Sequence, residues 1–146
     1  MQDRISTFSS FYQVSRETIS SLVKYEKILI EANKNLNLIG KSTINTIWTR
    51  HILDSYQVID FIEENDRTLL DIGSGAGFPG LVIAIAAKEK KIPIKINLIE
   101  KSSKKAKFLT DVINKLNLDV KVTCENILKS DKKIYEEILV ARAFKP

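Results

Sequence analysis

The sequence predicts an α/β protein with a doubly wound, mostly parallel sheet and a helical cap before it. Apolar residues recur at helical spacing through the first part of the chain, residues 1–65. From Thr68 onward, short aliphatic runs alternate with helix-length segments. Four of the five glycines fall between Gly73 and Gly80, directly after the first of these runs. A chain of 146 residues has room for a single core, so the cap and the sheet part, residues 66–146, are expected to form one unit.

The cap is predicted to hold two long helices after a helical turn or two. Ser15 is a suitable N-cap for the first long helix, and the second is expected from about Thr43 to Ile62. The apolar stripe of the first consists of Ile19, Leu22, Val23, Leu29, Ala32 and Leu36. The second should bury Ile44, Ile47, Trp48, Ile52, Ile59 and Ile62. The short upstream helix carries Ile5, Phe8, Phe11 and Tyr12.

Four runs are predicted to form the sheet: TLLDIG (68–73), IKINLIE (94–100), VKVTC (120–124) and a last strand near Ile138 to Arg142. A helix is expected from Pro79, as its first helical residue, to about Glu89. A second is expected from about Ser103 to Leu116. Parallel strands joined by right-handed helical crossovers give a doubly wound sheet.

Composition narrows the classes of protein that the sequence can encode. The longest apolar run, Leu81 to Ala87, is seven residues, whereas a membrane-spanning helix needs about 20. The first residues lack the features of a secretory leader. Cys124 is the single cysteine, and with His51 alone it cannot supply the ligands of an ordinary zinc site. We therefore expect a soluble, cytoplasmic protein without a metal, and a buried Cys124.

The glycine-rich loop after the first predicted strand is a candidate site. Glycine permits a tight turn, positive φ and close approach of a ligand to the backbone. The string Gly75-Ala-Gly77-Phe-Pro-Gly80 matches the GxGxxG pattern of dinucleotide-binding proteins. The match is offset, because the strand ends at Ile72 and Gly73 already occupies the turn. We expect Gly73, Gly75 and Gly77 to cradle a small molecule.

Two acidic residues favour S-adenosylmethionine over a dinucleotide at this loop. Asp71 stands at the end of the first strand, where a carboxylate suits a cationic or hydroxyl-bearing ligand better than a pyrophosphate. S-adenosylmethionine carries an ammonium and a sulfonium and no phosphate. Glu100 ends the next predicted strand, 23 residues after Gly77, where it can accept hydrogen bonds from both ribose hydroxyls. A nicotinamide site, or a tight turn with both acids facing solvent, are the alternatives.

Strings at four places along the chain, the first of them a pair, carry a resemblance to a known family. NKNLNLIGKS (33–42) and RHILDS (50–55) precede the loop, LLDIGSGAGFPGL (69–81) contains it, LIEKSSKKAKFL (98–109) follows, and ARAFKP (141–146) ends the chain. With them the sequence resembles the class I methyltransferases, and among these ribosomal RNA small subunit methyltransferase G, also called glucose-inhibited division protein B. The resemblance implies methyl transfer from S-adenosylmethionine to N7 of a guanine in the 530 loop of 16S rRNA.

Members of that family continue past the RAF string with further strands, whereas this chain stops at Pro146. The resemblance therefore implies a fragment that ends after the fourth strand, with one sheet edge uncovered and part of the RNA-facing surface missing. The partners it implies are 16S rRNA or the small ribosomal subunit. We expect a monomer.

The resemblance also assigns site residues. Gly73 and Phe78 correspond to loop positions that contact the cofactor, and Arg142 to the arginine of the RAF string beside the active site. Arg142 is expected to contact the cofactor and to act in catalysis, where its planar fork can orient a base or a phosphate. A plain surface arginine is the alternative.

A further cofactor segment follows the third predicted strand. Aligned with the family's adenine-contact segment, it comprises Asn126, Ile127 and Leu128. The family usually ends this segment in an acidic residue, and Leu128 departs from that pattern. Backbone contacts to the adenine can survive the departure.

The expected reaction needs no strong general base. Guanine N7 keeps a free lone pair at neutral pH, so catalysis falls to alignment of the base, the methyl group and the sulfur. His51 lies on the second predicted helix, where Asp54 one turn away can hydrogen-bond its ring. We expect a structural rather than a catalytic role for His51, and a core position for Trp48.

Seven lysines form the densest basic cluster of the sequence. The net charge of +5 admits a polyanionic partner, and such a cluster would bind RNA phosphates with an affinity that falls as salt rises. A solvated helix face is the alternative. The seven are Lys88, Lys90, Lys91, Lys101, Lys104, Lys105 and Lys107.

Two other functions stay open at this point. An NAD(P)-binding oxidoreductase is disfavoured by Asp71 and by the lack of a Tyr-Lys or His catalytic arrangement. An inactive cofactor- or RNA-binding fragment is consistent with the abrupt end of the chain.

Overall fold

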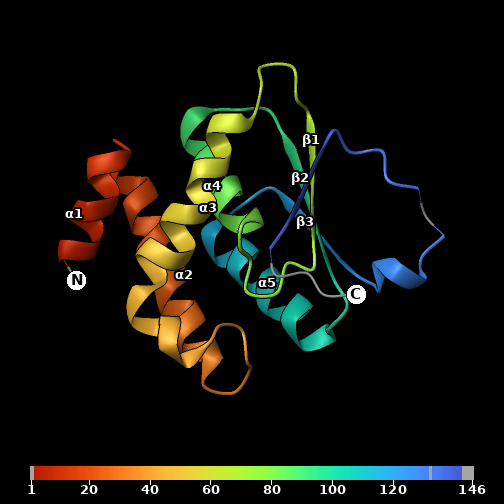
Figure 1. The fold of residues 1–146 in the computed structure, drawn as a ribbon, viewed down its shortest axis with the longest axis horizontal. Coiled ribbons are helices and arrows are strands. Elements are labelled where there is room, and N and C mark those ends of the chain that lie inside the picture. Colours follow the sequence, from red (N-terminus) through yellow and green to blue (C-terminus); the bar gives the residue numbers. More distant parts are fainter. Residues whose placement is uncertain (1, 132, 143–146) are drawn as a thin grey trace.

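The computed structural model describes residues 2–131 and 133–142 (Figure 1). These residues form a four-stranded, entirely parallel sheet with the strand order β3-β2-β1-β4 and with helices packed against it. The predicted parallel α/β fold is thereby confirmed. Residues 143–146, the end of the ARAFKP string, lie outside the described residues.

The four strands lie where the sequence predicts them. β1 spans Thr68–Ile72, β2 Lys95–Glu100, β3 Val120–Cys124 and β4 Ile138–Ala141. Since all four strands run in the same direction and in register, their carboxyl ends meet at one edge of the sheet. In an open α/β sheet, ligands bind outside this edge.

Two helices connect the first three strands. α5 spans Ser103–Leu116, as predicted, and the Ser102 side chain caps it by accepting a hydrogen bond from the Lys105 N–H. α4 spans Gly80–Lys90, so Pro79 is its N-cap rather than its first helical residue.

The helices and the last crossover cover opposite faces of the sheet. α2 (Arg16–Asn33) packs against both α4 and α5, and in Figure 1 these three helices lie on the left of the sheet, which is seen nearly edge-on. The segment between β3 and β4 runs on the right. Its described residues contain a short 3₁₀ turn, η4 (Ile127–Lys129), and no α-helix. The chain therefore winds onto both faces, with helices on one of them.

The first part of the cap follows the prediction closely. α1 spans Gln2–Phe11, and the Ser15 side chain caps α2 by accepting a hydrogen bond from the Thr18 N–H at 3.2 Å. Leu22 is fully buried, as the stripe requires. Phe8 of α1 is buried, whereas Phe11 at its end is 64% exposed.

The second predicted helix of the cap lies where the sequence places it, because residues 41–61 are helical without a gap, but it is not one regular α-helix. The chain forms four short segments between Lys41 and Phe61. They are the 3₁₀ helix η1 (Lys41–Thr46), the π-helix η2 (Ile47–Leu53), the single turn α3 (Asp54–Tyr56) and the 3₁₀ helix η3 (Gln57–Phe61).

Threonine hydroxyls account for part of this irregularity. Thr43, Thr46 and Thr49 each donate a hydrogen bond to the carbonyl three residues earlier, at 2.8, 3.3 and 3.3 Å. Such side-chain to backbone bonds compete with the regular helical ladder. The apolar periodicity of the sequence gives no sign of these bonds. Trp48 nevertheless lies in the core, at 1% exposure, as predicted.

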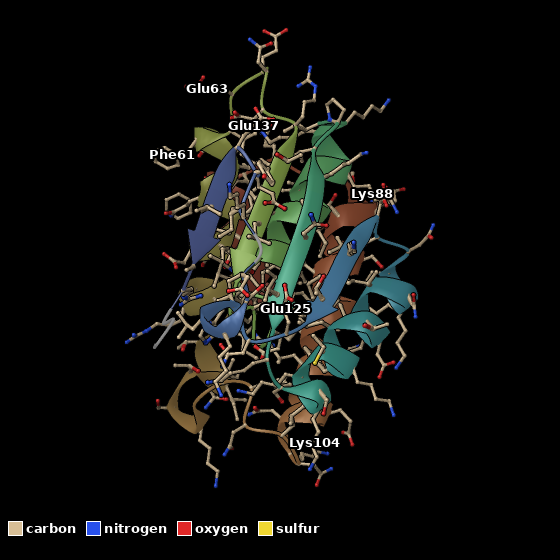
Figure 2. All side chains as sticks on the ribbon, turned by 90° about the vertical axis from the view of Figure 1, so that its right-hand side faces the viewer. Phe61, Glu63, Lys88, Lys104, Glu125 and Glu137 are labelled. Carbon is tan, nitrogen blue, oxygen red and sulfur yellow. The ribbon has the colours of Figure 1, made fainter. Side chains whose placement is uncertain are left out.

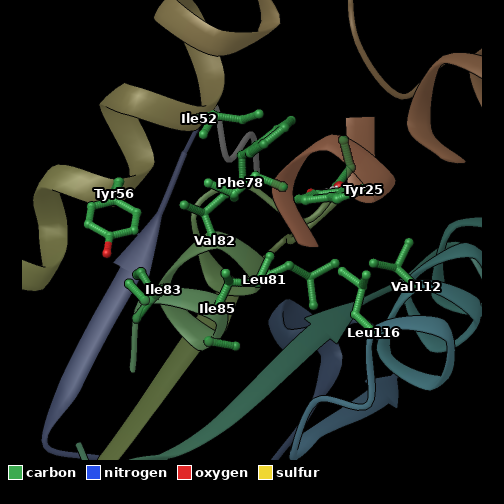
Figure 3. Close-up of a cluster of buried hydrophobic side chains, with 14 of the residues drawn as sticks. Tyr25, Ile52, Tyr56, Phe78, Leu81, Val82, Ile83, Ile85, Val112 and Leu116 are labelled. Atoms are coloured by element: carbon green, nitrogen blue, oxygen red, sulfur yellow. Dashed lines mark hydrogen bonds between the residues drawn. The ribbon is translucent and has the colours of Figure 1, made fainter. Parts of the chain in front are cut away.

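The core lies between the sheet and the cap. Residues Leu81–Ala87 of α4 are all buried, since the sheet covers one side of this helix and the cap the other. In Figure 3, Tyr25 of α2 and Ile52 of η2 lie on either side of Phe78, next to α4. No described helix is long and apolar enough to cross a membrane. Cys124, expected in the core, is exposed at the end of the edge strand β3.

Candidate functional site

A cavity of about 440 Å³ opens at the carboxyl edge of the sheet. Its volume is in the range of small-molecule sites. It lies among the glycine-rich loop, the ends of β2 and β3, the cap and the end of β4. The lining residues are Leu38, Ile39, Gly40, His51, Gly73, Ser74, Gly75, Ala76, Phe78, Ile99, Glu100, Lys101, Lys105, Glu125, Asn126, Ile127, Leu128 and Arg142.

The glycine-rich loop turns back over the end of β1. Gly73, Gly75 and Gly77 all have positive φ, at 70°, 54° and 98°, a conformation that other residues rarely adopt. The Gly73 and Ser74 N–H groups donate to the Ile99 carbonyl at 2.9 and 3.1 Å, which fixes the loop to β2.

The structure gives the three glycines different surroundings. An added Cβ at Gly75 would meet only the Gly73 carbonyl oxygen, at 3.9 Å, so this backbone is open toward the cavity. An added Cβ at Gly77 would lie 2.5 Å from the Tyr25 hydroxyl and 2.6 Å from Leu81. Gly77 does not line the cavity, and its lack of a side chain serves packing against the cap.

Asp71 lies beneath the loop and outside the cavity lining. It is 0% exposed, and its Oδ2 accepts a hydrogen bond from the Gly80 N–H at 2.9 Å. Burial raises the pKa of Asp71 to about 7, against the lowering effect of the Gly80 bond. The structure therefore gives Asp71 the task of tying the loop to α4, and does not bring its carboxylate to the ligand space as the sequence analysis expected.

Glu100 lines the cavity at the end of β2. Its two carboxylate oxygens accept hydrogen bonds from the Gly75 N–H at 2.9 Å and the Ser102 N–H at 2.8 Å. The side chain thus joins the glycine-rich loop to the start of α5. A carboxylate oxygen accepts more than one hydrogen bond, so Glu100 can also accept bonds from a ligand.

The segment after β3 forms another wall of the cavity. Asn126, Ile127 and Leu128 all line it, as predicted for a cofactor segment. The Asn126 side chain accepts a hydrogen bond from the Leu128 N–H at 3.0 Å and so fixes the short turn η4. Leu128 is 58% exposed, an apolar surface at the rim.

His51, Phe78 and Arg142 meet at the side of the cavity that faces the cap. The rings of His51 and Phe78 are stacked, with centroids 4.9 Å apart and 14° between their planes. Arg142 Nη2 donates to the Arg50 carbonyl at 2.6 Å and lies 3.8 Å from Asp54 Oδ2. Asp54 therefore contacts Arg142, and the hydrogen bond that its spacing allowed to the His51 ring is not formed.

The surroundings of His51 keep its ring neutral. Loss of solvent lowers its pKa most, the Arg142 charge lowers it further, and the Asp54 carboxylate opposes them, which gives a value of about 4. Its Nε2 lies 3.0 Å from Thr43 Oγ1. Because His51 sits in the π-helical segment η2, its placement on the cavity wall could not be predicted from regular helical spacing.

The loop between the two parts of the cap also reaches the cavity, which the sequence analysis missed. Leu38, Ile39 and Gly40 form part of the wall. The Asn33 side chain accepts hydrogen bonds from the Leu38 and Ile39 N–H groups at 2.8 and 3.0 Å. A signal was present, because these residues belong to the NKNLNLIGKS string that carries the family resemblance.

The seven lysines expected in one cluster form two groups. Figure 2 shows Lys104 at the bottom of the molecule and Lys88 well above it at the right, because α4 ends and α5 begins at opposite edges of the sheet. We call Lys101, Lys104, Lys105 and Lys107 the proximal lysines, since two of them line the cavity and two line a groove between α2 and α5. The distal lysines are Lys88, Lys90 and Lys91, around the end of α4.

Comparisons with protein families and with known proteins show which proteins this chain is similar to. A family model described as rRNA small subunit methyltransferase G matches residues 18–146. The ribosomal RNA small subunit methyltransferase G of Pelagibacter ubique is 41% identical over 135 residues, which are 91% of this chain and 63% of the relative. That of Bartonella henselae is 45% identical over 130 residues, 88% of this chain and 60% of the relative. The chain thus spans about three fifths of these proteins.

Solved structures share the fold at low sequence identity. A coclaurine N-methyltransferase bound to N-methylheliamine and SAH matches 96% of this chain and 48% of its own, with a TM-score of 0.52 and 14% identity. A mutant MtNAS in complex with S-adenosylmethionine matches 86% of this chain and 50% of its own, with a TM-score of 0.50 and 14% identity. These likenesses concern the fold alone.

Proposed function

The chain belongs to the rRNA small subunit methyltransferase G family, and from this premise we propose that it carries the S-adenosylmethionine site of a methyltransferase that modifies N7 of a guanine in the 530 loop of 16S rRNA. The name of the relatives supplies the class of substrate. The guanine, its N7 and the 530 loop come from the sequence resemblance. Because the chain spans about three fifths of its relatives, the activity of the whole protein is part of this proposal, as is a cytoplasmic location beside the ribosome.

The observation that carries the proposal is the pairing of Glu100 with an open Gly75 on one wall of the cavity. The Gly75 N–H donates to the Glu100 carboxylate, both residues line the cavity, and the glycine leaves the backbone uncovered there. Glu100 would hold the ribose hydroxyls, and the aliphatic side chains of Ile99, Ile127 and Leu128 would flank the adenine. The cavity volume fits a nucleoside of this size.

The residues of the chain support the reaction by position rather than by proton transfer. When bound, S-adenosylmethionine supplies an electrophilic methyl group on a sulfonium, which the free lone pair of guanine N7 takes without loss of a proton. His51, with a pKa of about 4, is neutral at physiological pH and adds no cation beside the sulfonium. Arg142, on the side of the cavity that faces the cap, would orient the RNA. Alignment of this kind can contribute several kcal/mol, up to about 10.

Calorimetric titration with S-adenosylhomocysteine and, separately, with NAD tests the site. We expect heat from the first and none from the second. Glu100→Gln should weaken binding by roughly tenfold or more, because one of the two backbone N–H groups loses its acceptor. Asp119→Asn removes the same charge from an exposed position and serves as the control. Heat from NAD alone would overturn the proposal.

Transfer of a labelled methyl group tests the reaction. The acceptors are naked 16S rRNA and the small ribosomal subunit, and the modified nucleotide is located by mass mapping. Label on one guanine of the 530 loop is the expected result. S-adenosylhomocysteine binding without label in either acceptor would identify an inactive cofactor-binding chain.

A further inference from the structure

The hydrogen bonds around His51 fix which ring nitrogen carries the proton. Thr43 Oγ1 donates its single proton to the Gly40 carbonyl oxygen at 2.8 Å. Its contact with His51 Nε2 at 3.0 Å must therefore be one in which the hydroxyl oxygen accepts. The proton of the neutral ring is consequently on Nε2. Nδ1 keeps a free lone pair and can act only as an acceptor.

Two buried polar atoms at this wall lack a hydrogen-bond partner among the described residues. One is His51 Nδ1, and the other is Arg142 Nη1. Both residues line the cavity, and Arg142 Nη2 donates to the carbonyl of Arg50, which precedes His51, so the two groups are neighbours. The two atoms themselves are buried in this structure, so a base must displace the side chains that cover them. Buried polar atoms without partners are uncommon in folded proteins and call for an explanation.

The two atoms have opposite hydrogen-bonding character. Arg142 Nη1 is a donor and His51 Nδ1 an acceptor. On a guanine, O6 is an acceptor and the adjacent N1–H is a donor, and N7 is engaged by neither. Adenine has the reverse pattern, with a donor amino group at C6 and an acceptor N1.

From this complementarity we propose that His51 is a specificity-determining residue: its Nδ1 accepts the N1–H of the target guanine while Arg142 Nη1 donates to O6. The inference rests on the proposed function and names the group that selects its base. Held in this way, the guanine presents N7 without a competing hydrogen bond. With an adenine, the donor Arg142 Nη1 would face the donor amino group, and the acceptor His51 Nδ1 would face the acceptor N1. Both buried protein groups would then stay unpaired.

The rest of the wall holds the His51 ring in place. Phe78 stacks on one face of the ring, and Thr43 and Gly40 fix its Nε2 edge. The charged groups that affect its titration are Arg142, Asp54 and Arg50. Their combined effect, with loss of solvent, keeps the Nδ1 lone pair free throughout the neutral range.

Nitrogen NMR tests the proposal directly, because His51 is the only histidine of the chain. In protein labelled with nitrogen-15 histidine, one pair of ring signals reports the protonation of Nδ1 and Nε2. We expect a neutral ring with its proton on Nε2 at about pH 7, in line with a pKa of about 4. A proton on Nδ1 would contradict the assignment.

The same signals report recognition of the base. Two short single-stranded RNAs are added in the presence of S-adenosylhomocysteine, one with guanosine as its only purine and one with adenosine. We expect the Nδ1 signal to move toward its hydrogen-bonded position with the guanosine RNA and to stay unchanged with the adenosine RNA. Equal shifts with both RNAs, or no shift with either, would overturn the proposal.

Variants separate recognition from folding and from cofactor binding. His51→Asn keeps an acceptor near the Nδ1 position and should retain part of the preference for guanosine. His51→Gln places its amide near Nε2 instead and should lose that preference, by roughly tenfold or more in relative RNA affinity. Equal losses in both variants would contradict the inference.

Two substitutions of Thr43 test the hydrogen bond that holds the Nε2 proton of His51. Thr43→Val removes the acceptor for the Nε2 proton and should weaken guanosine selection, whereas Thr43→Ser should retain it. S-adenosylhomocysteine titration of each variant gives the control. Binding that persists while selection falls supports the role of His51, and a wild-type chain that binds no S-adenosylhomocysteine would instead refute the proposed function.

Discussion

At the scale of single residues, the glycine-rich loop shows that one motif contains positions with different tasks. Gly75 faces the cavity and donates to Glu100, whereas Gly77 faces Tyr25 and Leu81 in the core. The Tyr25 hydroxyl donates to the Ala76 carbonyl between them, which fixes the loop to α2. The GxGxxG pattern cannot distinguish the two glycines, because the helix that packs on Gly77 lies far away in the sequence.

Alanine substitutions should separate these tasks. Gly77→Ala forces a Cβ against Tyr25 and Leu81 at positive φ, and we expect the free energy of unfolding to fall by about 2–4 kcal/mol. Gly75→Ala has space for its Cβ and should cost about 1–2 kcal/mol from the backbone conformation alone, with a larger loss of S-adenosylhomocysteine affinity. Denaturant unfolding and calorimetry measure the two effects. Similar stability losses in both variants would contradict the distinction.

The ionisation of Asp71 makes the stability of the fold depend on pH. Its pKa of about 7 in the folded protein is above the value of about 4 in an unfolded chain. The folded state therefore binds more protons between these pH values, and the contribution of Asp71 to stability is fully present below about pH 4 and lost as pH rises through about 7.

The Asp71→Asn variant tests this sign. Its amide oxygen can still accept the Gly80 N–H, but the group no longer ionises. We expect the stability of the variant relative to wild type to increase steadily between about pH 4 and about pH 7 and to level off above. Unfolding curves at several pH values give this difference. A relative stability that falls as pH rises would show that the folded-state pKa of Asp71 is lowered instead.

At the scale of elements, the bounds of a regular helix or strand could be predicted from residues close together in the sequence. The helical spacing of the apolar residues in α5 and the β-branched run of β3 both act within a few residues. The bounds of both elements therefore followed from the sequence. The break-up of residues 41–61 did not, because threonine hydroxyls and the packing of η2 against α1 decide the backbone there. The same break places His51 on the cavity wall.

Ser15 connects the start of α2 to the end of α4. Its side chain caps α2 and also bonds Glu89 of α4 at 2.9 Å. Ser15→Ala should lower the free energy of unfolding by about 1 kcal/mol from the cap, with a further loss from the Glu89 contact. Aspartate is usually as good an N-cap as serine. Ser15→Asp should nevertheless be destabilising here, because it places a second carboxylate beside Glu89, and Ser15→Asp with Glu89→Gln should recover stability.

At the scale of the whole molecule, the site depends on where the sheet brings distant segments. The cap, the glycine-rich loop, the segment after β3 and the end of β4 meet at the carboxyl edge. That Gly73, Gly75 and Glu100 line the cavity could be predicted from their order along the chain, whereas Gly77 does not line it. The loop at 38–40 could not, because its position depends on how α2 ends over the sheet.

The same topology places the two groups of lysines differently with respect to the cavity, which bears on the proposed binding of RNA. The proximal lysines lie beside the cavity, whereas the distal lysines lie at the other end of the sheet. If RNA reaches the cavity, phosphates should contact the proximal group alone. Each phosphate contact on single-stranded RNA contributes about 0.7 to the slope of log affinity against log salt.

Two double variants test this division. Lys101→Gln with Lys105→Gln should weaken binding of a 530-loop RNA and reduce the magnitude of the salt slope by about 1.4. Lys90→Gln with Lys95→Gln removes the same charge from exposed positions at the far edge and should leave the slope unchanged. Equal reductions in both would mean that RNA responds to net charge and not to the arrangement at the cavity. Because phosphate contacts carry no base sequence, neither double variant should alter the preference for guanosine, which the geometry assigns to His51 and Arg142.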